Sequence, residues 1–142
     1  MKMSFFAERK LKVLDVALGA YHTVVLCKNL EENQNRVFCF GSSEKGQVGY
    51  GGSLEQHTPV ELTDKIPGEV IQIAAGGLHT LILTKDNKVY GCGKVSNGQL
   101  GFVPQKKVKA QLTPMEVKMP ANVKVHSVHC GSLTSMALCS EE

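Results

Sequence analysis

An internal repeat limits this chain to folds that are built from copies of one structural unit. Residues 13–25 read Val-Leu-Asp-Val-Ala-Leu-Gly-Ala-Tyr-His-Thr-Val-Val, and residues 70–82 read Val-Ile-Gln-Ile-Ala-Ala-Gly-Gly-Leu-His-Thr-Leu-Ile, a shift of 57 positions. A third copy at 125–138 keeps the glycine but has Thr134 in the place of the histidine. Self-similarity at such a period is typical of solenoids, propellers and other repeat arrays.

Two further blocks recur in the same order along the chain. Residues 37–49, VFCFGSSEKGQVG, align with residues 89–101, VYGCGKVSNGQLG, at a shift of 52 positions. Residues 57–62 align with residues 112–117 around a shared Thr-Pro pair. The two shifts differ because Glu-Glu-Asn-Gln-Asn at 31–35 is extra in the first copy. A polar insertion of this kind is expected in a surface loop.

Each repeat predicts about four short β-strands. The segments between glycines are short and rich in Val, Ile, Leu, Phe and Tyr, which favours strands over helices. Asp86-Asn87 is expected to form a tight turn between two of them. In the best copy the expected strands are 58–62, 70–75, 79–84 and 88–92. Four strands in a unit of about 50–55 residues indicate a propeller blade.

We therefore predict an all-β chain that forms a partial, open β-propeller of four-stranded antiparallel blades. The spacing allows Met3–Phe6 to serve as the first strand of the first unit, because Met3 precedes Val13 by ten positions, as Val60 precedes Val70. The whole chain, residues 1–142, is expected to be a single domain. Its repeat units are predicted at about 3–57, about 58–112 and an incomplete 113–142.

The residues that recur at matching positions are predicted to be structural. A glycine that ends a strand and starts a hairpin accommodates a positive φ or a close approach of the backbone. His22 and His79 occupy the same place in two units, so a histidine that hydrogen-bonds a neighbouring backbone group is favoured over a catalytic one. The predicted structural residues are Gly19, His22, Gly41, Gly46, Gln47, Gly49, Gly76, His79, Gly93, Gly98, Gln99, Gly101 and Gly131.

No catalytic, cofactor-binding or metal-binding residue is predicted. The five cysteines are odd in number and form no Cys-x-x-Cys pair, and no cluster of histidines and cysteines has zinc-ligand spacing. The loop Gly41–Val48 has Gln47 where a phosphate loop needs lysine. A net charge of +3, from 16 basic and 13 acidic residues, is too balanced to indicate nucleic-acid binding. The sequence predicts neither a membrane span nor a signal peptide, so an intracellular location, cytoplasmic or nuclear, is expected.

The repeat resembles that of the RCC1 (regulator of chromosome condensation) family. The resemblance rests on Val-x-x-Ile-Ala-Ala-Gly-Gly-Leu-His-Thr, Lys-Val-Tyr-Gly-Cys-Gly and Asn-Gly-Gln-Leu-Gly, and it covers nearly all of residues 13–139. It implies a seven-bladed propeller, of which this chain supplies about two and a half units. Phe40 and Cys92 stand where the family commonly has tryptophan, and the third copy lacks the histidine.

We expect a non-enzymatic module that binds another protein or docks as a structural subunit. The resemblance implies an alternative, in which the chain is part of a guanine-nucleotide exchange factor for a Ran-type small GTPase with chromatin association. No exchange residue is assigned, because the matching motif is the structural repeat. An incomplete array exposes an apolar face at each end and a free strand edge, so self-association or a partner chain is expected in place of a stable free monomer.

Overall fold

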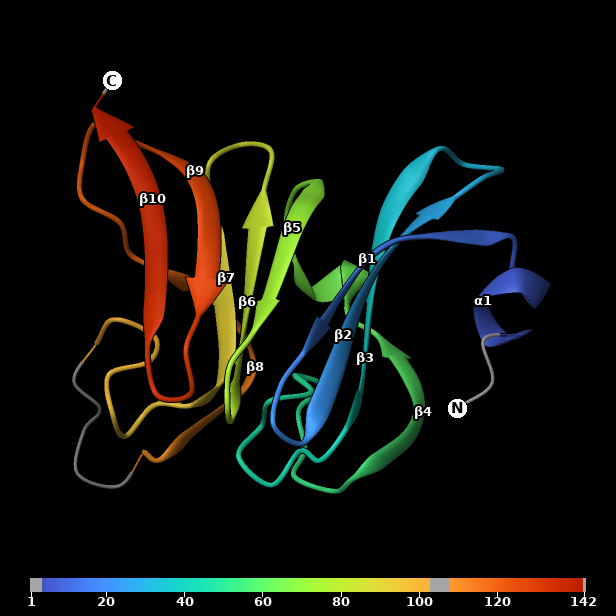
Figure 1. The fold of residues 1–142 in the computed structure, drawn as a ribbon, viewed down its shortest axis with the longest axis horizontal. Coiled ribbons are helices and arrows are strands. Elements are labelled where there is room, and N and C mark those ends of the chain that lie inside the picture. Colours follow the sequence, from blue (N-terminus) through green and yellow to red (C-terminus); the bar gives the residue numbers. More distant parts are fainter. Residues whose placement is uncertain (1–3, 103–107, 142) are drawn as a thin grey trace.

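The chain folds into three consecutive antiparallel sheets that stack side by side (Figure 1). The structure is a computed structural model that describes residues 4–102 and 108–141. Blade one is ordered β1-β2-β3-β4, and blade two is ordered β5-β6-β7-β8. Within the described residues, blade three consists of β9 and β10 alone. Their bounds are β1 Leu11–Leu18, β2 His22–Asn29, β3 Gln34–Gly41, β4 Gln56–Glu61, β5 Val70–Ala75, β6 His79–Thr84, β7 Val89–Lys94, β8 Ala110–Val117, β9 Val123–Cys130 and β10 Ser135–Glu141.

The predicted fold class is confirmed: the chain is nearly all-β, with open, four-stranded antiparallel sheets. The strand β6 shows why the sequence folds in this way, since every one of its residues is buried. Leu81 and Leu83 pack toward blade three, whereas Ile82, on the opposite side of the strand, packs toward blade one. Alternating side chains therefore bury both faces of one sheet against its two neighbours.

The strand near residue 60 belongs to a different blade from the one expected. The sequence predicted 58–62 as the first strand of the second unit, but β4 is the fourth strand of blade one and pairs with β3 through Cys39 and Val60. Blades one and two thus span 11–61 and 70–117, offset from the repeat units at 3–57 and 58–112. A repeat gives the period of the array, whereas the sheet that a strand joins depends on which free edge lies nearest.

The same offset overturns the strand expected at Met3–Phe6. Met3 lies outside the described residues, and Ser4–Glu8 form a short helix, α1. The counterpart of this segment in the second repeat unit is β4, which pairs with the edge of blade one. Among the described residues no such edge exists before blade one, so the segment coils and packs Phe5 and Phe6 edge-on against Phe38.

The hydrophobic core is divided by the blades. One cluster fills the junction of blades one and two, a second fills the junction of blades two and three, and a third lies between α1 and the outer face of blade one. A 3-10 turn, Thr63–Lys65, joins β4 to β5. Each inter-blade junction therefore holds an apolar core, and its polar residues lie beside that core.

Candidate functional site

A hydrogen-bond relay joins blade two to blade one. The hydroxyl of Thr80, on β6, lies 2.7 Å from the main-chain oxygen of Gln47 and donates to it. The Nε2 atom of His22, on β2, lies 2.9 Å from the same hydroxyl oxygen. Because the hydroxyl proton goes to the carbonyl, the imidazole has to donate from Nε2–H. His22 thus carries a proton on Nε2, and two groups of blade one hold one hydroxyl of blade two.

The relay recurs one blade further along. Ser135, which aligns with Thr80, donates to the main-chain oxygen of Gln99 at 2.6 Å. The Nε2 atom of His79 lies 3.0 Å from the Ser135 hydroxyl oxygen and 3.1 Å from the main-chain oxygen of Thr134. The histidines and glutamines that recur in the sequence therefore meet in space, where they line successive blade junctions.

Local turns explain why the glutamine carbonyls are available. The side-chain oxygen of Gln47 accepts from the backbone N–H of Lys45 at 2.9 Å, and that of Gln99 accepts from Asn97 at 2.9 Å. Each glutamine thus closes its own turn, and its main-chain oxygen accepts from a hydroxyl of the next blade. The glycines of these two turns have positive φ; they are Gly46, Gly49, Gly98 and Gly101.

The remaining repeat glycines make room for the histidine rings or end the third strands. A Cβ atom at Gly19 would lie 2.2 Å from Cε1 of His22 and 2.6 Å from the main-chain oxygen of Gly76, so no side chain fits there. Gly76 lies in the same way against His79, while Thr134 fills the corresponding space over Gly131. Gly41 is the last residue of β3 and Gly93 the next-to-last residue of β7, with φ values of 109° and 112°.

Both relay histidines are held neutral. Burial lowers the pKa of His22 to about 4, opposed in part by a backbone hydrogen bond that involves His79. Burial also lowers the pKa of His79, opposed by its hydrogen bond to Thr134. A buried imidazolium has lost its hydration. Within residues 4–102 and 108–141, the Nδ1 atoms of His22 and His79 also have no hydrogen-bond partner that would stabilise the charge. The lowered pKa, together with donation from Nε2–H, makes the neutral ring protonated on Nε2 the form that fits the relay.

Two asparagines that sequence reasoning missed also bridge the blades. Asn35 donates to the main-chain oxygen of Val70 at 2.8 Å, and Asn87 donates to that of Val123 at 2.7 Å. Asn35 and Asn87 are related by the same shift of 52 as the second repeat block. This shared shift could have identified the two asparagines as equivalent. In the sequence, however, Asn35 belongs to the polar insertion at 31–35 and Asn87 to the expected turn at Asp86-Asn87.

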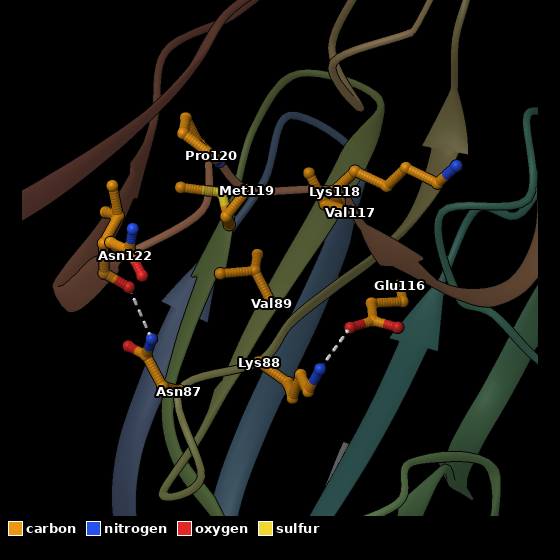
Figure 2. A pocket seen from close by; sticks show the side chains of 10 residues that line it. Asn87, Lys88, Val89, Glu116, Val117, Lys118, Met119, Pro120 and Asn122 are labelled. Atoms are coloured by element: carbon orange, nitrogen blue, oxygen red, sulfur yellow. Dashed lines mark hydrogen bonds and ion pairs between the residues drawn. The ribbon is translucent and has the colours of Figure 1, made fainter.

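The Asn87 contact lies at one side of a cavity of about 400 Å³ at the outer junction of blades two and three (Figure 2). The ion pair between Lys88 and Glu116, at 3.0 Å, lies at another side, and Val89 lies between the two contacts. This pairing raises the pKa of Lys88, chiefly through the hydrogen bond to Glu116. The side chains around this cavity stabilise the junction and bring no nucleophile and base together.

The cysteines have the environment of apolar side chains. Cys27, Cys39 and Cys92 are buried, and all five cysteines are free thiols. Burial raises the pKa of Cys27 to about 11 and that of Cys92 to about 12, so these thiols stay protonated. In the described ranges 4–102 and 108–141, no three His, Cys, Asp or Glu side chains gather into a group that could hold a metal ion. No helix within those ranges is long and apolar enough to cross a membrane.

The two ends of the stack differ. On the outer face of blade three, Met136 and Leu138 are each 63% exposed, whereas the aligned Leu81 and Leu83 of blade two are 3% and 1% exposed. On the outer face of blade one, the fully buried Phe6 of α1 covers the apolar patch around Phe38. The blade-three end is therefore the less covered of the two.

Four-stranded blades that stack through a repeated junction define a propeller-type repeat protein. Residues 34–83 and 86–138 match the regulator of chromosome condensation (RCC1) repeat, and residues 70–99 match a second description of that repeat. The chain therefore belongs to the RCC1 repeat family, as the sequence motifs predicted.

The relatives are longer proteins. The human protein named probable E3 ubiquitin-protein ligase HERC4 is 31% identical over 132 residues, which are 92% of this chain and 12% of that protein. Human WBSCR16 is 29% identical with a TM-score of 0.69, and 85% of this chain covers 30% of that structure. Yeast RCC1 (Prp20), in a crystal structure with bound Kap60, is 27% identical with a TM-score of 0.67, and 89% of this chain covers 30% of it.

These relatives correct one expectation. The sequence predicted a protein that is not an enzyme, but HERC4 and the human relative HERC6 are both named as probable ubiquitin-protein ligases. That expectation is therefore wrong as it was made. It rested on finding no active site in one repeated segment, and a segment that aligns with about an eighth of a relative says nothing about the class of the whole protein.

Proposed function

We propose that this chain is a protein-interaction module and that its blade-three end is the docking surface. The observation that carries the proposal is the exposure of Met136 and Leu138, at positions where blade two buries both side chains. An apolar surface that the repeat normally covers is favoured as a binding site. Membership of a repeat family whose relatives include yeast RCC1 bound to Kap60 supports a protein partner.

Double replacement of Met136 and Leu138 by lysine tests the docking surface. The wild-type protein is expected to associate in solution, because a second copy covers the face when no partner is present. Its weight-average mass should rise above 15.4 kDa with concentration, and that of the double variant should stay at 15.4 kDa. Sedimentation velocity measures both. Leu54→Lys is the matched control, since Leu54 is even more exposed, at 75%, but lies on blade one's β3–β4 loop. A wild-type protein that is monomeric at every concentration contradicts the proposal.

Guanine-nucleotide exchange on a Ran-type small GTPase, with chromatin association, is a second candidate. The observation in its favour is the similarity to yeast RCC1, which this chain covers over 30% of its length. Release of labelled GDP from such a GTPase, measured with and without this chain, separates exchange from simple binding. The five free cysteines support a reducing compartment, cytoplasmic or nuclear, for either role.

A further inference from the structure

In the part of the chain that the structure describes, blade three has a free strand edge. The second strands of blades one and two pair on both sides, whereas β10 pairs only with β9 among the described residues. The backbone N–H of Gly131 donates to the oxygen of Thr134 at 2.9 Å, which directs the Thr134 carbonyl toward β9. Since these directions alternate along a strand, the backbone groups of Ser135 and Ala137 point away from β9. Blade two shows the use of such groups, because the N–H of Thr84 donates to the main-chain oxygen of Lys88, which directly precedes β7.

A cavity of about 220 Å³ lies beside this edge, between blades two and three. Ser135, Met136 and Ala137 of β10 form one side of it. The other side belongs to blade two and includes Leu81, Val89, Gln99, Gly101 and Val117. The cavity is thus continuous with the relay junction, and its blade-two residues also line the buried interface.

The equivalent space between blades one and two is filled by β7. The ring of Tyr90 is buried in the cluster that contains Val37 and Leu62. The thiol of Cys92 lies 3.6 Å from the main-chain oxygen of Gln47 and 3.0 Å from where a Cβ of Gly49 would be. In the sequence alignment, Val37, Gln47, Gly49 and Leu62 correspond to Val89, Gln99, Gly101 and Val117, and all four of these line the open cavity.

We propose that this cavity and the β10 edge bind an extended strand of a partner protein, with an aromatic residue and a small residue two positions apart. The register of blade two, in which Thr80 pairs with Cys92 and Ile82 pairs with Tyr90, assigns the positions. The small residue lies opposite Ser135, and the aromatic residue lies opposite Ala137 and enters the cavity. In such strand addition, backbone hydrogen bonds supply affinity, and pockets for the alternate side chains supply specificity.

A second copy of this chain is a poorer occupant. Among the described residues its strand of this pattern is β7, in which Cys92 follows Tyr90 by two positions, and β7 is already paired on both sides within blade two. Offering it would require blade two to open. A partner with an unpaired strand meets no such cost. The inference rests on the proposed docking role of blade three and names the kind of partner segment that it takes.

A synthetic peptide of the chain's own β7 segment, Lys-Val-Tyr-Gly-Cys-Gly-Lys-Val, is the probe. Fluorescence anisotropy of the labelled peptide with the full chain is expected to show saturable binding. A peptide with aspartate in place of the tyrosine and the cysteine should bind at least tenfold more weakly. Ala137→Pro, which removes one outward N–H at an edge that tolerates proline, should weaken binding at least tenfold. Ala137→Arg, which fills the cavity and leaves the backbone intact, should do the same if the proline variant does not fold.

Leu138→Lys separates this inference from the proposed function, because Leu138 does not line the cavity and its neighbour Ala137 does. This variant should bind the peptide as the wild type does and should associate less. Absence of peptide binding, or equal binding of the aspartate peptide, overturns the strand site and leaves the docking face intact. If Ala137→Pro loses self-association in the absence of peptide, the β10 edge is occupied by a second copy of the chain. That result would also overturn the proposed site for a partner strand.

Discussion

Replacing Thr80 by valine is expected to lower the free energy of unfolding by about 2–4 kcal/mol. Valine has nearly the shape of threonine, so packing changes little and the loss comes from the relay. The Nε2–H of His22 and the main-chain oxygen of Gln47 lose the hydroxyl that connects them, at the fully buried Thr80. A buried polar group left without a partner costs about 1–3 kcal/mol. The Nε2–H of His22 becomes such a group, and the main-chain oxygen of Gln47 keeps only the weak thiol donors of Cys39 and Cys92, at 3.8 and 3.6 Å.

Thr23→Val is the matched control for this substitution. Thr23 occupies the same repeat position on the outer face of blade one, where the described chain brings no histidine or glutamine carbonyl to its hydroxyl. We expect the control to change the free energy of unfolding by less than about 0.5 kcal/mol. Urea denaturation followed by circular dichroism measures both variants. Equal effects of the two substitutions would show that the relay does not join the blades.

The repeat predicted the architecture because strand length and glycine spacing are local properties of the chain. A segment such as Leu81–Leu83, which is apolar at every position, indicates a strand that is covered on both faces. The sheet to which β4 belongs could not be predicted in this way. Residues 56–61 have the same local pattern whether they begin one blade or close the preceding one. The choice is made by pairing with β3, whose paired residues lie fifteen or more positions earlier.

The candidate site, too, could be predicted from the sequence only in part. The sequence identified His22 and Gln47 as recurring residues, because both belong to marked motifs. It did not connect them to each other or to Thr80, since the three lie on separate segments and meet only when two blades stack. Exposure at Met136 was equally hidden, because an apolar residue in a strand pattern is expected to be buried. Its meaning emerged from comparison with Leu81, the same position one blade earlier.

Acidification from pH 7 to pH 4 is expected to destabilise the fold by about 3 kcal/mol through His22 alone. The ordinary pKa of histidine, 6.5, applies to the unfolded chain, and burial lowers the pKa of His22 to about 4 in the folded protein. At pH values between these two pKa values, the unfolded chain binds a proton at His22 that the folded protein does not bind. Stability due to this group is therefore complete above pH 6.5, falls as the pH decreases toward 4, and changes no further below that.

The measurement is the urea midpoint of unfolding at a series of pH values, compared between the wild type and His22→Gln. The glutamine side chain keeps an N–H donor for Thr80 and carries no titrating proton, so the variant should lose about one proton of pH dependence between pH 4 and 6.5. His57→Gln, at an exposed histidine on β4, should follow the wild-type profile. An unchanged profile in His22→Gln would contradict a neutral, buried His22. Protonation changes the charge of His22 and leaves its side-chain packing in place. A steep acid transition that is present in the wild type and absent in His22→Gln would therefore show that the blades stay docked only while His22 is uncharged.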